Sequence, residues 1–301
     1  MSRPALRDPA SPHPAQRRAL PALLLGGAAI GCSPIFVRVS EIGPVATAFW
    51  RLALALLPLL LMHGRERSKP GGHRQPRTIR DHAEVAAPGL FLASDLAAWH
   101  LSLHMTSVAN ATLLVNIAPI FVTLFSWLVL GQKIRRAFLI GLSVSLIGII
   151  ILKGGTGSLA DGAIKGDAVA VLAAAFYAGY ILLVGHLRTI YSTTTIMVWS
   201  TASAAAFTGL LTWLMEPSLL PLTIAGWAIL VSLAWISHAG GQGLIAYALA
   251  WLPPTMSSLT LLIQPVVASI LAWAVLKEPV TGAQLAGGVI VLTGILLARR
   301  A

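Results

Sequence analysis

The chain has 301 residues, of which 56% are hydrophobic and only 10% are charged, and its mean hydropathy is +0.81. About a quarter of the residues of an ordinary soluble domain are charged, so this composition excludes a water-soluble globule. The formal charge of +11 does not indicate a nucleic-acid partner, because membrane proteins retain Lys and Arg in their cytoplasmic loops.

Ten apolar segments follow one another along the chain, each about as long as a helix that crosses a bilayer. Residues 1–18 precede them as a disordered cytoplasmic tail, and residues 64–83 form a basic cytoplasmic loop, because neither stretch has apolar periodicity. The pattern predicts an all-α integral membrane protein with ten transmembrane helices and the lipid bilayer as its surroundings. The predicted spans are 19–38, 44–62, 84–103, 107–130, 137–152, 167–186, 194–215, 223–249, 255–276 and 281–298.

The basic residues predict the orientation of these spans. With the N-terminus inside, sixteen of the 21 Lys and Arg residues fall in cytoplasmic segments and Arg51 falls within a span. Such a bias places both termini in the cytoplasm of a bacterial-type inner membrane. A secretory or lipoprotein signal ending at Cys32 is the alternative for the N-terminus, but Ala29 replaces the preferred Leu and the apolar run continues past Pro34. The remaining four basic residues are outside: Arg38, Lys153, Lys165 and Lys277.

The chain also repeats itself at an offset of 146 residues. Residues 107–153 match residues 253–299 without gaps, and the matches include a proline, a tryptophan and two glycines in the same order. The offset spans five segments, an odd number, so the halves 19–153 and 165–299 would enter the bilayer in opposite orientations. Inverted five-helix repeats around a central substrate crevice are typical of secondary transporters. The matched pairs are Pro119 with Pro265, Trp127 with Trp273, Gly141 with Gly287 and Gly148 with Gly294.

These features resemble the drug/metabolite transporter superfamily, in its ten-span, EamA-type branch of two duplicated five-span units. The resemblance covers roughly residues 19–299, and it is closest to the bacterial inner-membrane exporters of amino acids and related metabolites. It therefore implies transport of small molecules without covalent chemistry. The residues that carry it are Phe49-Trp50-Arg51, Pro119, Pro265, the turns Gly131-Gln132-Lys133 and Lys277-Glu278-Pro279, Gly166-Asp167, and the glycines Gly141, Gly148, Gly287 and Gly294.

Two charged side chains lie well inside predicted spans, away from their ends, where an ionisable group is costly unless it is paired or faces water. Asp95 is about nine residues from the outer end of the third span and Arg51 about seven from that of the second, so their depths match. They could neutralise each other as a structural pair. Alternatively, Asp95 contacts a substrate ammonium group or takes up a proton during transport.

Aromatic and hydroxyl side chains add candidate substrate contacts. Trp99 lies one helical turn from Asp95 and either lines a cavity or anchors the helix at the interface. Tyr177 and Tyr180 share a face of the sixth span, where hydrogen bonds between helices are the alternative to a binding role. The repeat makes the sixth span the counterpart of the first, where Ser33 lies at a similar depth, so both spans would face the crevice.

The run His238-Ala-Gly240-Gly241-Gln242-Gly is the most unusual in the chain. Three glycines and two polar side chains weaken a lipid-facing helix, so we expect a gap or a close contact here. His238 and Gln242 are candidate substrate contacts and Gly240 and Gly241 a candidate hinge. Tight packing through small residues, with the polar groups bonded between helices, is the alternative.

The fourth and ninth spans contribute Asn116, a further candidate contact, and the matched prolines Pro119 and Pro265. Each proline frees a carbonyl four residues earlier, so hinges or static kinks are expected there. A single cysteine and eight histidines without a zinc-ligand spacing predict no metal, and we expect no cofactor.

The leading hypothesis is a secondary transporter that exports small metabolites, above all amino acids, by alternating access, as a multispecific facilitator or coupled to protons. The sequence has no Walker motif, which argues against ATP drive from this chain. A carrier of lipid-linked, nucleotide-type or drug-like substrates is the alternative. An intramembrane lipid-modifying enzyme and a channel are less well supported, because no catalytic motif or ring of pore-lining groups is evident. We expect a monomer, with a homodimer as the alternative.

Overall fold

The computed structural model describes residues 14–68, 74–105, 114–152, 164–216, 218–277 and 281–299, and the regular elements in these ranges are all helices. Within these ranges, seven helical segments are long and apolar enough to cross a membrane. Shorter apolar helices accompany them at Ala118–Leu128 and Arg136–Leu152. The expectation of an all-α membrane protein is confirmed to this extent.

The helices begin where local chemistry favours a start. Proline occupies the first turn of α2, α3, α6 and α12, where its missing N–H group costs nothing. Ser192 and Thr223 cap α9 and α10 through their side-chain oxygens. In chain order the elements are α1 (Pro14–Gly31), α2 (Ser33–Arg38), α3 (Pro44–Arg67), α4 (Ile79–Met105), α6 (Ala118–Leu128), α7 (Arg136–Leu152), α8 (Ile164–Leu187), α9 (Thr193–Met215), α10 (Ile224–Ser232), the π-helix η2 (Leu233–Gln242), α11 (Gly243–Ala248), α12 (Pro254–Thr260), α13 (Ile263–Leu276) and α14 (Gly282–Arg299).

Helices extend into two segments that were predicted from the sequence as a tail and a loop. Helix α1 begins at Pro14, inside the expected tail 1–18, and residues 1–13 lie outside the described ranges. The expected loop 64–83 is helical up to Arg67 and again from Ile79, with residues 69–73 outside the description. Counting apolar residues misses such helix ends, because polar and charged side chains occupy them. At the end of α3 the side chains of Arg65 and Arg67, and at the start of α4 that of Asp81, interact favourably with the exposed backbone groups.

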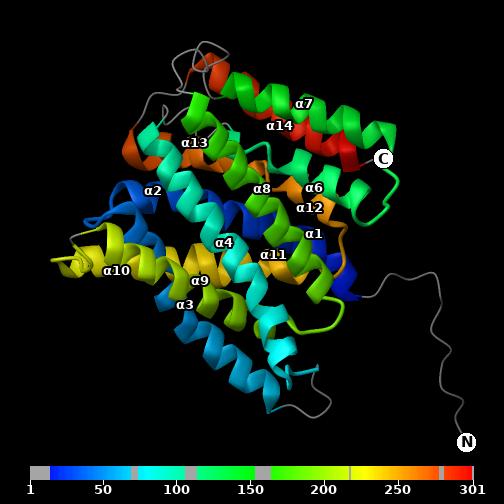
Figure 1. Cartoon of the computed structure of the whole chain (residues 1–301). Helices are drawn as coiled ribbons and strands as arrows, with labels where there is room; N and C mark the ends of the chain where they lie inside the picture. The colour runs from blue at the N-terminus through cyan, green and yellow to red at the C-terminus, as the bar shows by residue number, and fades with distance from the viewer. Residues whose placement is uncertain are drawn as a thin grey trace, which may run out of the picture.

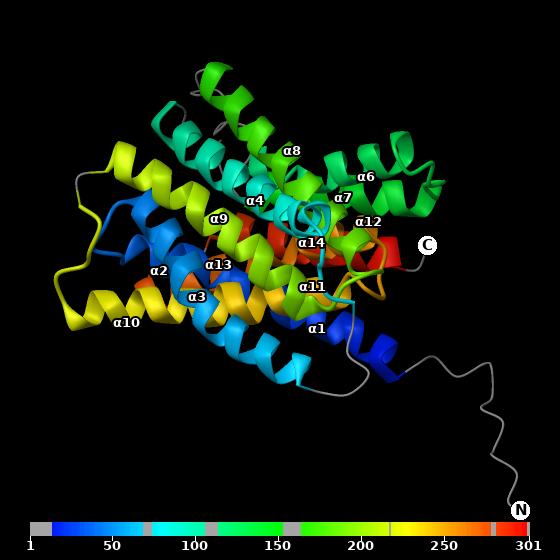
Figure 2. The ribbon, with the colours of Figure 1, turned by 60° about the horizontal axis from the view of Figure 1, so that its bottom comes forward.

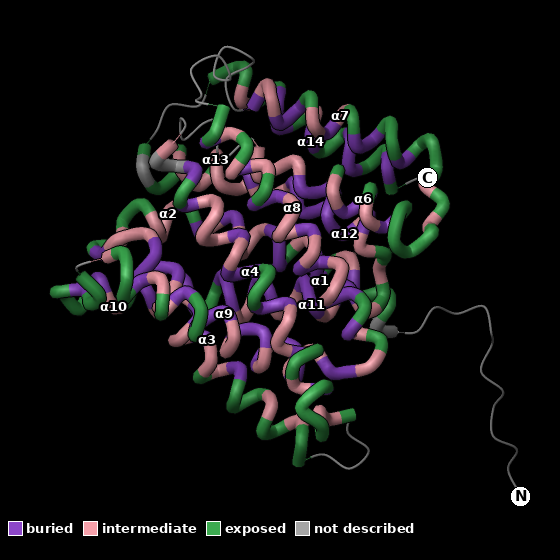
Figure 3. The backbone as a smooth tube through the Cα atoms, in the orientation of Figure 1, coloured by how far each residue is buried: buried purple, intermediate pink, exposed green. Residues whose placement is uncertain are grey.

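The helices cross over one another around a buried centre (Figures 1 and 2). Helices α1, α4, α8 and α11 run through the middle, while α7 and α14 lie side by side along one edge. Buried residues concentrate in the middle, and exposed ones follow the outer helices and the far ends of α3 and α10 (Figure 3). The polar side chains of the candidate site therefore lie where water is scarce.

Glycines bring α7 and α14 into backbone contact. A Cβ atom added at Gly141 would lie 2.6 Å from the Gly294 carbonyl oxygen, and one added at Gly148 would lie 2.6 Å from the Val291 nitrogen. The Ser145 hydroxyl donates to the Val291 carbonyl at 3.4 Å. These spaced glycines therefore permit close packing of the two helices.

Carboxylates form hydrogen bonds that connect helix starts with loops distant in sequence. Glu216 accepts hydrogen bonds from the backbone N–H groups of Val45 and Ala46 at the start of α3, at 2.7 and 2.9 Å. Glu41 accepts from the N–H groups of Leu222 and Thr223 and from the Thr223 hydroxyl, before α10. The hydroxyl bond is the main reason why the pKa of Glu41 lies below its usual value.

Asp81 makes a similar cluster at the start of α4. Its carboxylate accepts from the N–H groups of Arg77 and Thr78, both at 3.0 Å, and from the Tyr191 hydroxyl at 3.1 Å, and it pairs with Arg74 at 2.8 Å. The backbone bonds, that from Arg77 first, hold the pKa of Asp81 far below its usual range. Asp81 thus ties the connection before α4 to the connection between α8 and α9.

Candidate functional site

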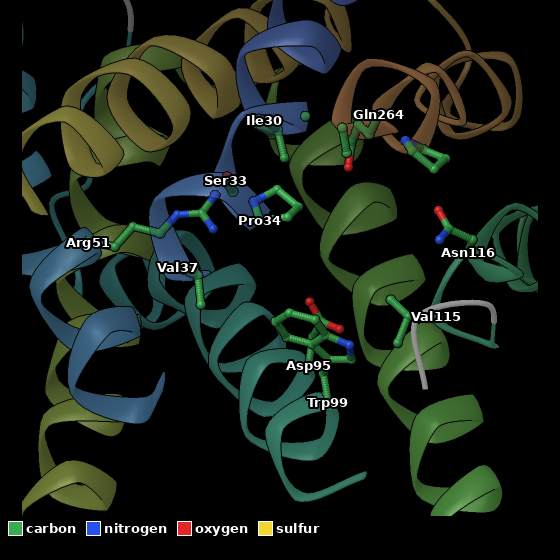
Figure 4. A pocket seen from close by; sticks show the side chains of 13 residues that line it. Ile30, Ser33, Pro34, Val37, Arg51, Asp95, Trp99, Val115, Asn116 and Gln264 are labelled. Carbon is green, nitrogen blue, oxygen red and sulfur yellow. The ribbon is translucent and has the colours of Figure 1, made fainter. Parts of the chain in front are cut away.

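Two adjoining cavities, of about 200 and 130 Å³, lie where α1, α3, α4 and α13 meet. They share five lining residues: Ile30, Arg51, Asp95, Val115 and Gln264. Together we name them the central cavity, and Figure 4 shows the residues that line the larger of the two. Both intramembrane charges predicted from the sequence therefore face the same space.

Arg51 and Asp95 approach the central cavity from different helices, α3 and α4 (Figure 4). Within the described ranges, the ion pairs closer than 4.0 Å are Arg74 with Asp81 and Arg80 with Glu84, so Arg51 and Asp95 are not joined directly. Asp95 is buried, with 8% of its surface exposed. The structure thus leaves a positive and a negative group apart across a space that a small molecule could occupy.

Unsatisfied polar atoms gather around the central cavity. Buried donors and acceptors in folded proteins are nearly always hydrogen-bonded, and those that are not call for an explanation. Six such side chains, without a protein partner for the atom concerned in the described part of the chain, line this one space. The atoms are Ser33 Oγ, Arg51 Nε, Asp95 Oδ1, Trp99 Nε1, Gln242 Oε1 and Gln264 Nε2.

Aromatic side chains form part of the wall. Trp99 lines the larger cavity, which favours the cavity-lining interpretation over the interfacial one. Tyr177 lines the smaller cavity, and its hydroxyl lies beside the side chains of Gln242 and Gln264. Tyr180 stacks on Tyr177 with ring centroids 6.0 Å apart and an interplanar angle of 17°, and it is almost fully buried. Tyr180 therefore supports the wall from behind, while Tyr177 faces the space.

The glycine-rich run does not interrupt its span but forms the π-helix η2. His238 lines the smaller cavity, with its Nε2 2.9 Å from the Thr201 hydroxyl of α9, and Gln242 lines it as well. A Cβ at Gly241 would lie 2.9 Å from the Ile30 side chain, whereas one at Gly240 would meet only the Trp235 carbonyl. The expected close contact is therefore at Gly241, against α1.

The two matched prolines follow breaks in their helices. Residues 116 and 117 form a turn directly before α6, and Pro119 is the second residue of that helix. Residues 261 and 262 form a turn directly before α13, and Pro265 is the third residue of that helix. The Leu261 carbonyl accepts a hydrogen bond from the Gln264 N–H at 3.0 Å in this turn. Asn116 and Pro265 line the larger cavity, whereas Pro119 is buried and is not among its lining residues.

The sequence-based candidates omitted Gln264, which lines both cavities, and the apolar wall. Gln264 had a visible signal, since it is a polar residue beside a proline in an apolar span. The apolar residues had none, because they resemble lipid-facing residues in every local respect. They are Ile30, Pro34, Val37, Val115 and Ala268.

Comparison with known proteins decides the family. The model of the EamA-like transporter family matches residues 17–153 and again residues 164–300. The chain belongs to the EamA-like transporter family. It is accordingly a multi-pass membrane protein and a transporter, not an enzyme, and the resemblance read from the sequence is confirmed.

Individual relatives are consistent with membership of this family. An uncharacterized transporter of Archaeoglobus fulgidus is 24% identical over 93% of this chain and 95% of its own. A probable terminal-alkyne amino-acid exporter of Streptantibioticus cattleyicolor is 28% identical over 88% of this chain and 87% of its own. A solved crystal structure superposes with a TM-score of 0.75 at 19% identity, covering 94% of this chain and 96% of that one, and it shows the same fold.

Proposed function

We propose that this transporter exports small zwitterionic metabolites, above all amino acids, and binds them in the central cavity. The observation that carries the proposal is the set of unsatisfied polar atoms around one space, with a carboxylate and a guanidinium among them. An α-amino acid carries the complementary groups at a short separation. The amino-acid exporter among the relatives supports the same substrate class.

Each charged group has a defined partner in this scheme. Arg51 binds the substrate carboxylate, because a guanidinium presents several donors in a fixed geometry. Asp95 accepts from the substrate ammonium group, and Tyr177, Gln242 and Gln264 complete the polar contacts. Trp99 and the apolar wall receive the substrate side chain, which allows several amino acids to bind.

We further propose that the chain consists of two inverted five-helix units, 19–153 and 165–299, forming ten spans. The two separate family matches support this. Gly131 and Lys277, which are 146 residues apart, both adopt left-handed backbone, with φ of 62° and 58°. Ser145 and Val291, at the same offset, are hydrogen-bonded to each other.

Contacts between helices support the same symmetry. Helix α3 packs on η2 as α9 packs on α4, and α1 packs on η2 and α11 as α8 packs on α4. Each contact is the counterpart of the other if the two halves are exchanged. Rocking of one unit against the other would expose the central cavity to each side in turn, with the breaks before Pro119 and Pro265 and the glycines Gly240 and Gly241 as hinges.

The orientation and surroundings are proposed as the charge distribution predicts. Both termini lie in the cytoplasm, the protein resides in a bacterial-type inner membrane, and it acts as a monomer without nucleic acid, metal or cofactor.

The test is efflux of labelled amino acids from proteoliposomes that contain the purified protein, with and without an imposed pH gradient. Leucine should be transported, whereas leucine methyl ester and N-acetyl-leucine, which lack one of the two charges, should be poor substrates. Arg51→Gln and Asp95→Asn should each weaken apparent leucine affinity roughly ten- to a hundredfold, the effect of losing a hydrogen bond to a charged group. Arg65→Gln, an exposed cation at the end of α3, is the matched control.

The substrate analogues separate the two roles. Arg51→Gln should abolish the preference for leucine over its methyl ester, and Asp95→Asn the preference over N-acetyl-leucine. Unchanged preferences in both variants would refute the assigned contacts, and a folded protein that moves no amino acid would refute the substrate class. Efflux that follows the pH gradient in the unaltered protein but not in Asp95→Asn would assign Asp95 to proton coupling instead of to substrate binding alone.

A further inference from the structure

A second hollow, of about 500 Å³, lies away from the central cavity, at the ends of other helices. Its walls come from the turn between α6 and α7, the start of α12 and the end of α14. These parts lie together near the C-terminus of the chain in both ribbon views (Figures 1 and 2). We name it the basic groove.

Three cations line the basic groove: Lys133 and Arg135 from the turn, and Arg299 from the last turn of α14. Lys133 and Arg299 are exposed and belong to elements far apart in sequence. No carboxylate is found among the described residues that line it. Like charges that line one groove repel one another, and this repulsion falls when an anion binds between Lys133 and Arg299.

The floor of the groove is apolar, which determines the kind of anion. Ile134, Phe138 and Met256 line it beside the cations, and Phe138 is buried. The turn follows the end of α6, where Val129 is 77% exposed and its neighbours Leu128 and Leu130 are exposed as well. An exposed apolar helix end beside exposed cations is the arrangement expected where a protein passes from the hydrocarbon layer to the headgroup layer of a bilayer.

We propose that the basic groove binds the headgroup of an anionic phospholipid. The phosphate contacts Lys133 and Arg299, and the acyl chains lie along the exposed apolar end of α6. A free phosphate would use the cations but leave the apolar floor in contact with water. A zwitterionic lipid would bring a positively charged ammonium group next to the cations. The site is independent of the central cavity, since the two share no lining residue.

Native mass spectrometry of the full chain in detergent tests this, with titration of phosphatidylglycerol, phosphatidylcholine of the same acyl composition, and glycerol 3-phosphate. Phosphatidylglycerol should bind preferentially. Lys133→Gln with Arg299→Gln should weaken its binding about thirtyfold, since each cation near a membrane surface contributes roughly fivefold to the affinity for anionic lipid. The matched control is Arg65→Gln with Arg67→Gln, which removes two exposed cations from the end of α3.

Each result of this lipid titration either supports or refutes the proposed site. Retention of phosphatidylglycerol by the control and its loss from the groove variant would support the site. Equal binding by the groove variant and the unaltered protein, or equal losses in both double variants, would refute it. Equal binding of phosphatidylcholine would refute the anionic specificity, and competition by glycerol 3-phosphate at equal affinity would refute the lipid as occupant. If the double variant does not fold, each single substitution should still weaken binding about fivefold.

Discussion

The glycine contact between α7 and α14 predicts a specific loss of stability. In Gly148→Ala the new Cβ would lie 2.6 Å from the Val291 nitrogen and 2.9 Å from the Gly287 carbonyl oxygen, whereas ordinary contact begins near 3.4 Å. Both neighbours are backbone atoms, so neither can rotate aside and the helices must move apart. Overpacking of this kind costs about 1–3 kcal/mol, against about 1 kcal/mol gained from the higher helix propensity of alanine.

Gly64→Ala is the matched control. It makes the same substitution in α3, but no heavy atom lies within 4 Å of the new Cβ, so only the gain in helix propensity applies. The free energies of unfolding of the two variants should therefore differ by about 2 kcal/mol. Thermal unfolding in detergent, followed by tryptophan fluorescence, measures the difference as a lower Tm for Gly148→Ala. Equal Tm values would refute the close approach of α7 and α14.

Three further predictions concern the loop clusters and the cavity wall. Asp81→Asn should destabilise the protein near pH 7. Because folding lowers the pKa of Asp81, the contribution of its carboxylate to stability is present above pH about 4 and is lost as the pH falls. The difference in Tm between the variant and the unaltered protein should therefore become smaller in acid, and a difference independent of pH would contradict this. Glu216→Gln should lower stability by about 1–2 kcal/mol through the weakened cap of α3, and an unchanged Tm would argue against the cap. With Cys32→Ser as background, Ser33→Cys should react with a membrane-permeant thiol reagent more slowly when leucine is present, and labelling that ignores leucine would separate Ser33 from the substrate site.

Features that depend on composition or on exact repetition could be predicted from the sequence. The helices follow from the length of the apolar runs, and the close packing of α7 on α14 follows from the spacing of Gly141, Gly148 and their counterparts. Asp95 was a clear site candidate because a carboxylate within an apolar segment costs free energy unless it is paired or faces water.

Features that depend on how segments remote in sequence pack against each other could not be predicted from the sequence. The distance between Arg51 and Asp95 is set by the packing of α3 and α4 around the cavity, and depth along each span does not determine it. Gln264 and Ile30 belong to the site only because α13 and α1 lie against the same space. The acidic cap at Glu216 depends on a contact 171 residues away along the chain, with Val45.

The π-helix has a consequence for comparing this chain with its relatives. A π-helix arises when one residue is inserted into an α-helix, and it is retained where the bulge serves a purpose. Removal of one residue between Leu233 and Gln242 would restore α-helical hydrogen bonding in this segment and leave the helix after it in the same orientation, because the wider π-helical turn accommodates the extra residue locally. Helix α11 would still present the same face to α1, and the change would be confined to the side chains within the π-helix, His238 among them. A one-residue gap at this point in a sequence alignment therefore marks a relative in which the cavity wall differs locally at η2, even where the flanking residues are identical.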